Sequence, residues 1–236
     1  MHNYKRVLIK ISGEALMGES GKVHNLEVIN YIAAQIQQIH SADIQICLVV
    51  GGGNIYRGNA EKAGGIERAS GDYIGMLATV INALAIQNAI EHLAVPCRVL
   101  SALSMTTICE PYIRRRAIRH LEKKRVVIFA AGTGNPFFST DTAAALRAAE
   151  MGCDILMKAT QVDGVYSADP KVHKNAIRFA HISYQEVISK DLRVMDTAAI
   201  SLAKENNIPI IIFSLKNSNM LLDILKGKGV YTLIAD

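Results

Sequence analysis

The sequence is poor in cysteine, and its four cysteines are isolated from one another. Cys47, Cys97, Cys109 and Cys153 include no C-x-x-C pair, the spacing typical of zinc sites and thiol redox motifs. This excludes a zinc knuckle and a disulfide framework, and it favours a reducing compartment such as the cytoplasm. The seven histidines also lack metal-ligand spacing, so we predict no metal site built from protein residues alone.

Long apolar runs are missing as well. Near the N-terminus, Lys10 interrupts the apolar run before it reaches the length of a signal peptide. The uncharged stretch Gly75–Ile90 contains Thr79, Asn82 and two further amide side chains. It therefore falls short of the roughly 18 apolar residues that a bilayer span requires. We interpret it as a buried helix and expect no membrane association.

Few residues of the chain are typical of linkers. Only 5 of the 236 residues are proline, and no Pro/Gly/Ser-rich tract, low-complexity segment or repeat divides the sequence. Half of the residues are apolar and 20% are charged, which is the balance of a globular protein with a large core. We therefore expect a single domain over residues 1–236. The net charge of +5 favours anionic partners such as phosphates without naming one.

Short apolar runs alternate with longer segments of helical period. Strands are predicted at Arg6–Ile11, Ile44–Val50, Cys97–Leu100, Arg125–Ala130, Asp154–Met157 and Ile208–Phe213. Helices are predicted at Leu26–His40, Asp72–Leu93, Pro111–Lys124, Thr142–Met151, Met195–Glu205 and Asn219–Lys226. This order predicts an α/β fold of three layers (α/β/α), with helices on both faces of a mostly parallel central sheet. Val230–Ala235 is either a hairpin strand at the sheet edge or a frayed tail.

Glycine and charged residues follow four of the predicted strands. The segments are Lys10–Glu14, Gly51–Arg57, Gly132–Asp141 and Lys158–Pro170. Ligands of open α/β sheets bind at the carboxyl ends of strands, where glycine lets backbone N–H groups approach phosphate oxygens. Turn geometry alone also explains a single glycine loop. Three consecutive glycines followed by Arg57 favour a phosphate-binding function.

The usual phosphate-binding motifs are absent. A Walker A motif requires Ser or Thr after Gly-Lys, but Val23 follows Gly21-Lys22. A dinucleotide fingerprint requires a third glycine, where this chain has Tyr56 and Phe137. The H-R-D and D-F-G tripeptides of protein kinases do not occur. These absences exclude P-loop kinases, hydride transfer and protein kinases, and they call for another phosphotransferase design.

The same segments together resemble the bacterial UMP kinase family. The matching runs are KISGEAL at Lys10–Leu16, GGGN at Gly51–Asn54, GTGNPFFSTD at Gly132–Asp141, and Ala159–Pro170. The resemblance extends from about Lys5 to Ile234. It implies the amino acid kinase fold, which aspartokinase, acetylglutamate kinase and carbamate kinase share, and this explains the missing Walker A motif.

The resemblance implies an activity and an assembly. The expected reaction transfers the γ-phosphoryl group of ATP to UMP with Mg²⁺ bound to ATP, giving UDP and ADP in cytoplasmic pyrimidine nucleotide biosynthesis. The expected assembly is a homohexamer built as a trimer of dimers. GTP or UTP is a candidate effector, but Gly18–Asn25 lacks the glycine-phenylalanine-glycine-isoleucine run of relatives that respond to GTP. The effector therefore stays open.

The resemblance also implies roles for individual residues. The expected catalytic residues are Lys10, Arg57 and Asp141, with Asp196 as a second acidic group near the reaction. Those expected to bind ATP are Lys10, Ile11, Ser12, Gly13, Gly53, Arg57, Thr160, Tyr166 and Asp169. Those expected to bind UMP are Gly52, Asp72, Thr133, Gly134, Asn135, Pro136, Phe137, Phe138, Ser139 and Thr140.

Elementary chemistry is compatible with these roles. Lys10 offers a compact positive charge, and the planar guanidinium of Arg57 suits a phosphate. Asp141 at a predicted helix start either caps the helix or orients Lys10 or Mg²⁺. Asp72, also expected at a helix start, has a carboxylate that can accept hydrogen bonds from ribose hydroxyls.

Two alternatives remain beside the expected activity. One is a related kinase acting on a carboxylate or carbamate, which would not be expected to carry the aromatic turn Asn135–Phe138. Another is a nucleotide-binding regulator that has lost catalysis, which should lack Lys10 or Arg57. We interpret the basic run Arg114–Arg125 as a solvated helix face, and we do not expect nucleic-acid binding.

Overall fold

We describe the protein from a computed structural model. The structure describes residues 4–18, 21–57, 65–170, 172–215 and 221–236.

A sheet of nine strands forms the centre of the fold. Its strands are β1 (Arg6–Ile11), β2 (Gln45–Val50), β3 (Cys97–Ser101), β4 (Glu110–Pro111), β5 (Val126–Ala130), β6 (Ile155–Thr160), β9 (His181–Ile182), β10 (Ile210–Ser214) and β11 (Thr232–Ile234). Their order is β4-β3-β5-β2-β1-β6-β10-β11-β9. Every pair in it is parallel except β10 with β11. A separate antiparallel ribbon pairs β7 (Val165–Tyr166) with β8 (Arg178–Phe179).

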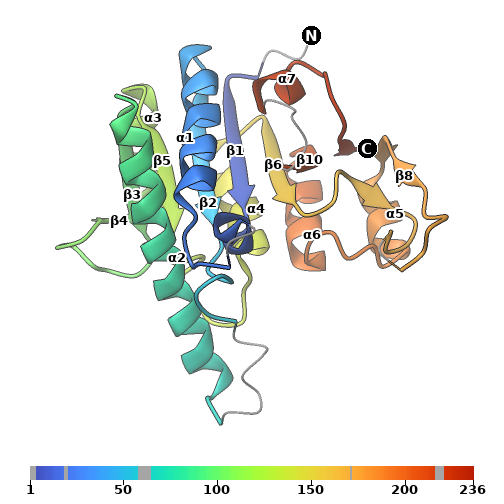
Figure 1. The fold of residues 1–236 in the computed structure, drawn as a ribbon, viewed down its shortest axis with the longest axis horizontal. Coiled ribbons are helices and arrows are strands. Elements are labelled where there is room, and N and C mark those ends of the chain that lie inside the picture. Colours follow the sequence, from blue (N-terminus) through green and yellow to red (C-terminus); the bar gives the residue numbers. More distant parts are fainter. Residues whose placement is uncertain (1–3, 19–20, 58–64, 171, 216–220) are drawn as a thin grey trace.

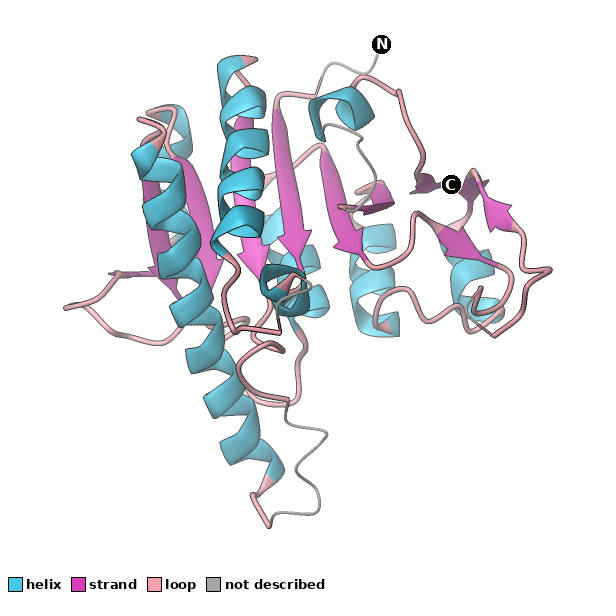
Figure 2. Ribbon diagram, in the orientation of Figure 1, coloured by secondary structure: helices cyan, strands magenta, loops and turns pink. Residues whose placement is uncertain are grey.

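Helices cover both faces of this sheet (Figures 1 and 2). One face carries α1 (Leu26–Ser41), α2 (Arg68–His92) and α7 (Leu221–Leu225). The other carries α3 (Arg114–Glu122), α4 (Thr140–Met151), α5 (Tyr184–Ser189) and α6 (Thr197–Glu205). Alternate residues of β1 divide between the two cores, with Val7 and Ile9 in the first and Leu8 in the second. The predicted three-layer α/β fold with a mostly parallel sheet is therefore confirmed.

The predicted elements form, with shifted boundaries. Helix α2 begins at Arg68 rather than at Asp72, and β6 continues to Thr160. Helix α3 begins at Arg114 because Glu110 and Pro111 form β4. The expected first two residues of α7 lie outside the described residues. The C-terminal segment forms strand β11, antiparallel to β10, so the alternative of a returning strand is confirmed and that of a frayed tail was wrong. Its position differs from the one expected, because β9 pairs with its outer side and is the edge strand.

Helix α2 is the longest helix of the described part of the chain, with 25 residues. By length and composition alone it could cross a membrane. In the fold it packs against α1, β2, β3 and β5, and it buries Thr79 and Asn82 against backbone groups of two loops. Figure 1 shows its first turns extending past the carboxyl ends of the strands. We therefore describe α2 as a core helix of this fold.

Candidate active site

The four glycine-rich segments follow four strands that lie side by side. Strands β5, β2, β1 and β6 are consecutive neighbours in the parallel sheet, so their carboxyl ends meet at one edge. Figure 1 shows the loops that follow these strands gathered at that end of the molecule. The four segments that follow the predicted strands therefore lie at one edge of the sheet.

A cluster of three charged side chains lies at the centre of this edge. Lys10 of β1 and Lys158 of β6 are direct partners in the register of the two strands, so their side chains project from the same face of the sheet. Lys10 Nζ lies 2.8 Å from Asp141 Oδ1, and Lys158 Nζ lies 2.5 Å from Asp141 Oδ2. All three are mostly buried. We call this group the Lys–Asp–Lys cluster.

The Lys–Asp–Lys cluster carries one excess positive charge. Burial by itself raises the pKa of Asp141, but the two ammonium groups outweigh burial and hold that pKa below its ordinary value. Burial also lowers the pKa of Lys158, which the nearby Asp141 carboxylate offsets only in part. With two lysines and one carboxylate, the cluster has a formal charge of +1, which favours an anion.

Asp141 reaches the cluster because helix α4 begins beside it. Ser139 is the N-cap and accepts hydrogen bonds from the N–H groups of Asp141 and Thr142. The Ser139 hydroxyl also bonds to Asp196, whose carboxylate lies 3.4 Å from the Thr142 hydroxyl. The cap is therefore Ser139, and Asp141 is free of the capping role that the sequence left open for it.

Two glycines allow the turn after β2 to pack closely, one against the turn after β1 and the other against helix α2. A Cβ atom on Gly13 would lie 2.6 Å from the Gly51 carbonyl oxygen, and one on Gly52 would lie 2.7 Å from the Gly75 carbonyl oxygen. Neither contact is possible for a larger residue without a backbone shift. Asn82 of α2 fixes the same turn, because its Nδ2 donates to the Gly51 carbonyl and to Asn54 Oδ1, each at 2.7 Å.

The loop after β5 is held from the side by helix α2. The Phe137 N–H donates to Asp72 Oδ2 at 2.7 Å, and Arg68 Nε lies 2.9 Å from the same oxygen. The Arg68 guanidinium lies over the Phe137 ring, 5.7 Å from its centroid. Asp72 is thus one turn inside α2 rather than at its start, where it engages the loop backbone.

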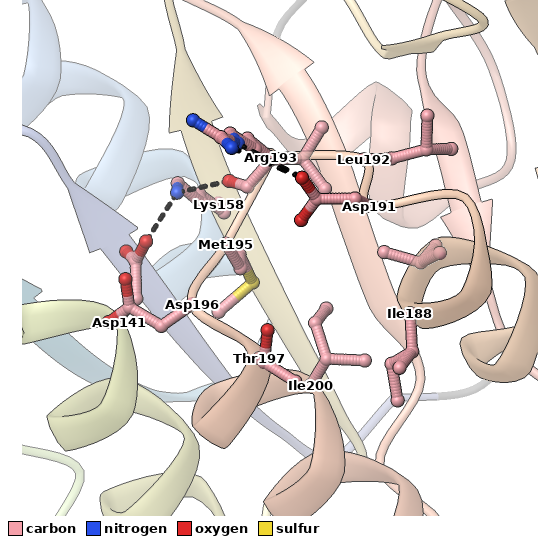
Figure 3. A pocket seen from close by; sticks show the side chains of 12 residues that line it. Asp141, Lys158, Ile188, Asp191, Leu192, Arg193, Met195, Asp196, Thr197 and Ile200 are labelled. Carbon is pink, nitrogen blue, oxygen red and sulfur yellow. Dashed lines mark hydrogen bonds and ion pairs between the residues drawn. The ribbon is translucent and has the colours of Figure 1, made fainter.

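Among the described residues, four cavities open along this edge. The first, of about 140 Å³, is lined by Gly52, Gly53, Tyr56, Gly71, Asp72, Gly75, Met76, Thr79, Gly132, Thr133, Phe138 and Thr140. The second, of about 460 Å³, is lined by Asp141, by Lys158 and by parts of the segment 187–200 (Figure 3). The third, of about 440 Å³, is lined by Tyr166, Asp169 and parts of the segment 190–194. Figure 3 shows Lys158 pointing to Asp141, at the side of the second cavity.

The predicted site residues are divided among different cavities. Gly52, Asp72, Thr133, Phe138 and Thr140 share the first cavity, and so does Gly53, which was expected at ATP. Tyr166 and Asp169 share the third cavity. Thr160 instead lines the fourth cavity, of about 550 Å³, beside Glu14 and α1.

Three further predicted residues do not present side chains to these cavities. Arg57 is exposed and pairs with Glu14 at 2.6 Å. Ile11 is buried in the core on the α1 and α2 face, so only its backbone is near the site. Phe137 is 68% exposed.

Sequence reasoning missed the role of Lys158. The residue was noted only as the first residue of a loop, whereas it lies inside β6. The available signal was a lysine among apolar strand residues in the run ILMKAT. A buried lysine in such a strand needs a counter-charge.

The site has counterparts in known proteins. The family model described as "Amino acid kinase family" matches residues 5–214. The chain belongs to the amino acid kinase family. A uridylate kinase of Wolbachia pipientis is 60% identical over 99% of this chain and 94% of its own length. One of Paramagnetospirillum magneticum is 56% identical, again over 99% of this chain and 97% of its own length.

Two solved structures agree with the fold of this chain. A UMP kinase of Bacillus anthracis superposes with a TM-score of 0.96 at 38% identity, covering 100% of this chain and 97% of that one. A UMP kinase of Ureaplasma parvum superposes with a TM-score of 0.94, also at 38% identity, with both chains covered completely.

Proposed function

We propose that this chain transfers the γ-phosphoryl group of ATP to a phosphate oxygen of UMP. A bond forms between the UMP oxygen and the γ-phosphorus, the bond from that phosphorus to the β-bridging oxygen breaks, and UDP and ADP result. The observation that carries the proposal is the buried Lys–Asp–Lys cluster, two of whose residues, Asp141 and Lys158, line the second cavity. The similarity to uridylate kinases over nearly the whole chain supports UMP as the acceptor.

The chemistry of phosphoryl transfer fits such a cluster. The acceptor oxygen of UMP is already anionic, so no strong general base is required. Phosphoryl transfer depends mainly on positioning and on neutralising charge in the transition state. Lys10 and Lys158 supply that positive charge from adjacent strands, and Asp141 fixes the position of both ammonium groups.

We assign the two substrates to separate parts of the sheet edge. UMP occupies the cavity lined by Asp72 and the loop that follows β5. ATP lies along the turns after β1 and β2, with Ser12, Gly13, Gly53 and Arg57 near its phosphates and Thr160, Tyr166 and Asp169 near its nucleoside. This arrangement brings the γ-phosphate and the acceptor together at the Lys–Asp–Lys cluster.

Mg²⁺ fits this site as an ion that is bound with ATP. Within the described residues, no group of three or more His, Cys, Asp or Glu side chains could hold a metal ion. Mg²⁺ is commonly held by substrate phosphates and one or two carboxylates. Asp196, which is exposed and lines the second cavity, would supply such a carboxylate. When bound, the ion offsets negative charge on the phosphate oxygens.

A coupled assay of ADP release tests the proposed activity. The acceptors are UMP, CMP, dTMP, aspartate and acetylglutamate, each with ATP and Mg²⁺. We expect turnover with UMP to exceed that with every other acceptor. Turnover with aspartate or acetylglutamate and none with UMP would instead identify a carboxylate kinase, which the comparisons do not favour.

We propose that the chain acts as one amino acid kinase domain over residues 1–236, in the cytoplasm, within pyrimidine nucleotide biosynthesis.

Helix α2 exposes Ile74, Leu77 and Ile81, at 38%, 47% and 50%, and such a contiguous apolar face favours a subunit contact. A homohexamer arranged as a trimer of dimers would have a mass of about 154 kDa, six times 25.7 kDa. Light scattering tests this, and a stable monomer would refute it.

An effector role for GTP or UTP remains a prediction. Part of the segment expected to respond, residues 19–20 of Gly18–Val23, lies outside the described residues. Measuring UMP turnover at several concentrations of either nucleotide tests this role.

A further inference from the structure

Helix α2 buries a hydroxyl group beside the loop that we assign to UMP. Thr79 is 2% exposed and lines the cavity of about 140 Å³. Its Oγ1 donates to the Met76 carbonyl oxygen at 2.7 Å and accepts from the Ala131 N–H at 2.7 Å. One oxygen atom thus joins the middle of the helix to the end of β5.

The backbone at Ala131 has an unusual conformation. Ala131 has a φ angle of 61° and Gly132 one of 58°, so the chain enters the left-handed region directly after β5. That region is unfavourable for a residue with a Cβ atom. Ala131 is also fully buried, where an unsatisfied N–H would cost free energy. The Thr79 hydroxyl meets this requirement and stabilises the turn.

We propose that Thr79 is a positioning residue for UMP. It touches the loop backbone at Ala131 and acts through the two residues that follow, Gly132 and Thr133, which line the acceptor cavity. The inference rests on the proposed function, because it assigns Thr79 to the acceptor side of that same reaction.

The geometry predicts which Thr79 variants distinguish a role in positioning the UMP-binding loop from a role in the stability of the fold alone. Valine has nearly the shape of threonine but has no hydroxyl, so Thr79→Val leaves the Ala131 N–H buried without an acceptor. The N–H can then reach another acceptor only if the turn changes, which displaces Gly132 and Thr133. Thr79→Ser retains the oxygen and should retain the turn.

A matched control exists in strand β11. Thr232 is fully buried, and its hydroxyl accepts from the Val165 N–H at 2.9 Å. Thr232→Val therefore removes the same kind of hydrogen bond, but at a residue that lies outside the acceptor cavity. Comparing the two Thr→Val variants separates the loss of a buried hydrogen bond from the loss of the acceptor loop's position.

The experiment measures UMP and ATP dissociation constants by calorimetry, with thermal unfolding and steady-state kinetics on the same full-length variants. We expect Thr79→Val to weaken UMP binding about tenfold and to change ATP binding less than about twofold, since one unsatisfied buried donor has effects of this order. Thr79→Ser should bind UMP like the original protein. Thr232→Val should lose a similar amount of thermal stability with unchanged UMP affinity.

Other outcomes would contradict either the inference about Thr79 or the proposed function. If Thr79→Val is less stable but binds UMP normally, Thr79 is only structural and the inference is wrong. If Thr79→Val does not fold, Thr79→Ala against Thr79→Ser tests the same hydroxyl, and equal UMP affinities overturn the inference. If the original protein neither binds nor phosphorylates UMP, the proposed function itself fails.

Discussion

The two sides of the site hold their charges in different ways. At the Lys–Asp–Lys cluster, adjacent parallel strands bring two buried lysines to one buried carboxylate. On the acceptor side, Asp72 is held by Arg68, a partly exposed residue one turn away on the same helix, and by a loop N–H group. Buried charge acts through a low dielectric, whereas exposed charge is screened by water. We therefore expect the buried cluster to dominate turnover and the acceptor side to govern affinity.

The largest effect should come from Lys10. We expect Lys10→Ala to lower turnover by at least about a hundredfold, because one preorganised charge on the transferring group is worth several kcal/mol. Steady-state assays with saturating ATP and UMP measure this, and circular dichroism checks the fold. Lys204→Ala, which changes a half-buried lysine on α6 that donates to Gln185, serves as the control. Normal turnover in a folded Lys10→Ala protein would remove Lys10 from the reaction centre.

The next largest effect is expected for Asp141, the negatively charged partner of the two buried lysines. Asp141→Asn leaves two buried ammonium groups without a carboxylate, and we expect it to lower the free energy of unfolding by about 3 kcal/mol at neutral pH. Urea unfolding measured from pH 7 down to about pH 2 tests this expectation.

The pH dependence of stability provides the control for Asp141→Asn. The folded pKa of Asp141 lies below its ordinary value of 3.8. The contribution of Asp141 is therefore complete above the unfolded pKa and is lost as the pH falls through the folded pKa. The original protein should lose stability in acid, and Asp141→Asn should lack that part of the loss. Identical pH profiles for the two proteins would show that Asp141 is not the charged partner of the lysines.

The Lys–Asp–Lys cluster and the acceptor side also show how much of the structure could be predicted from the sequence. Strand β1 was predicted with its observed boundaries, because its apolar run ends at a Ser-Gly pair. The pairing of Lys10 with Lys158 was missed, because strand register depends on contacts between residues about 150 positions apart. The start of α2 at Arg68 was also missed, since Asp72 pairs with Arg68 inside the helix and was mistaken for a start signal.

The acceptor side should respond through substrate affinity. We expect Asp72→Asn to raise the UMP concentration needed for half-maximal rate about tenfold, because the variant loses a charged acceptor for the Phe137 N–H and for ribose hydroxyls. The ATP requirement should change less than about twofold. Glu67→Gln, which alters an exposed carboxylate directly before α2, is the matched control. An equal effect on both substrates would remove Asp72 from the acceptor site.

The smallest effect is expected at Arg57, although the resemblance assigns it a catalytic role. Its side chain is 58% exposed and pairs with the exposed Glu14, and exposed ion pairs contribute only about 0–1 kcal/mol. We expect Arg57→Ala to reduce turnover by less than about tenfold and to act mainly on the ATP requirement. Because salt screens exposed charges, the difference between Arg57→Ala and the original protein should shrink at high ionic strength. The loss caused by Lys10→Ala should persist there. Turnover in Arg57→Ala as low as in Lys10→Ala, and insensitive to salt, would mean that Arg57 moves into the buried cluster when substrates bind.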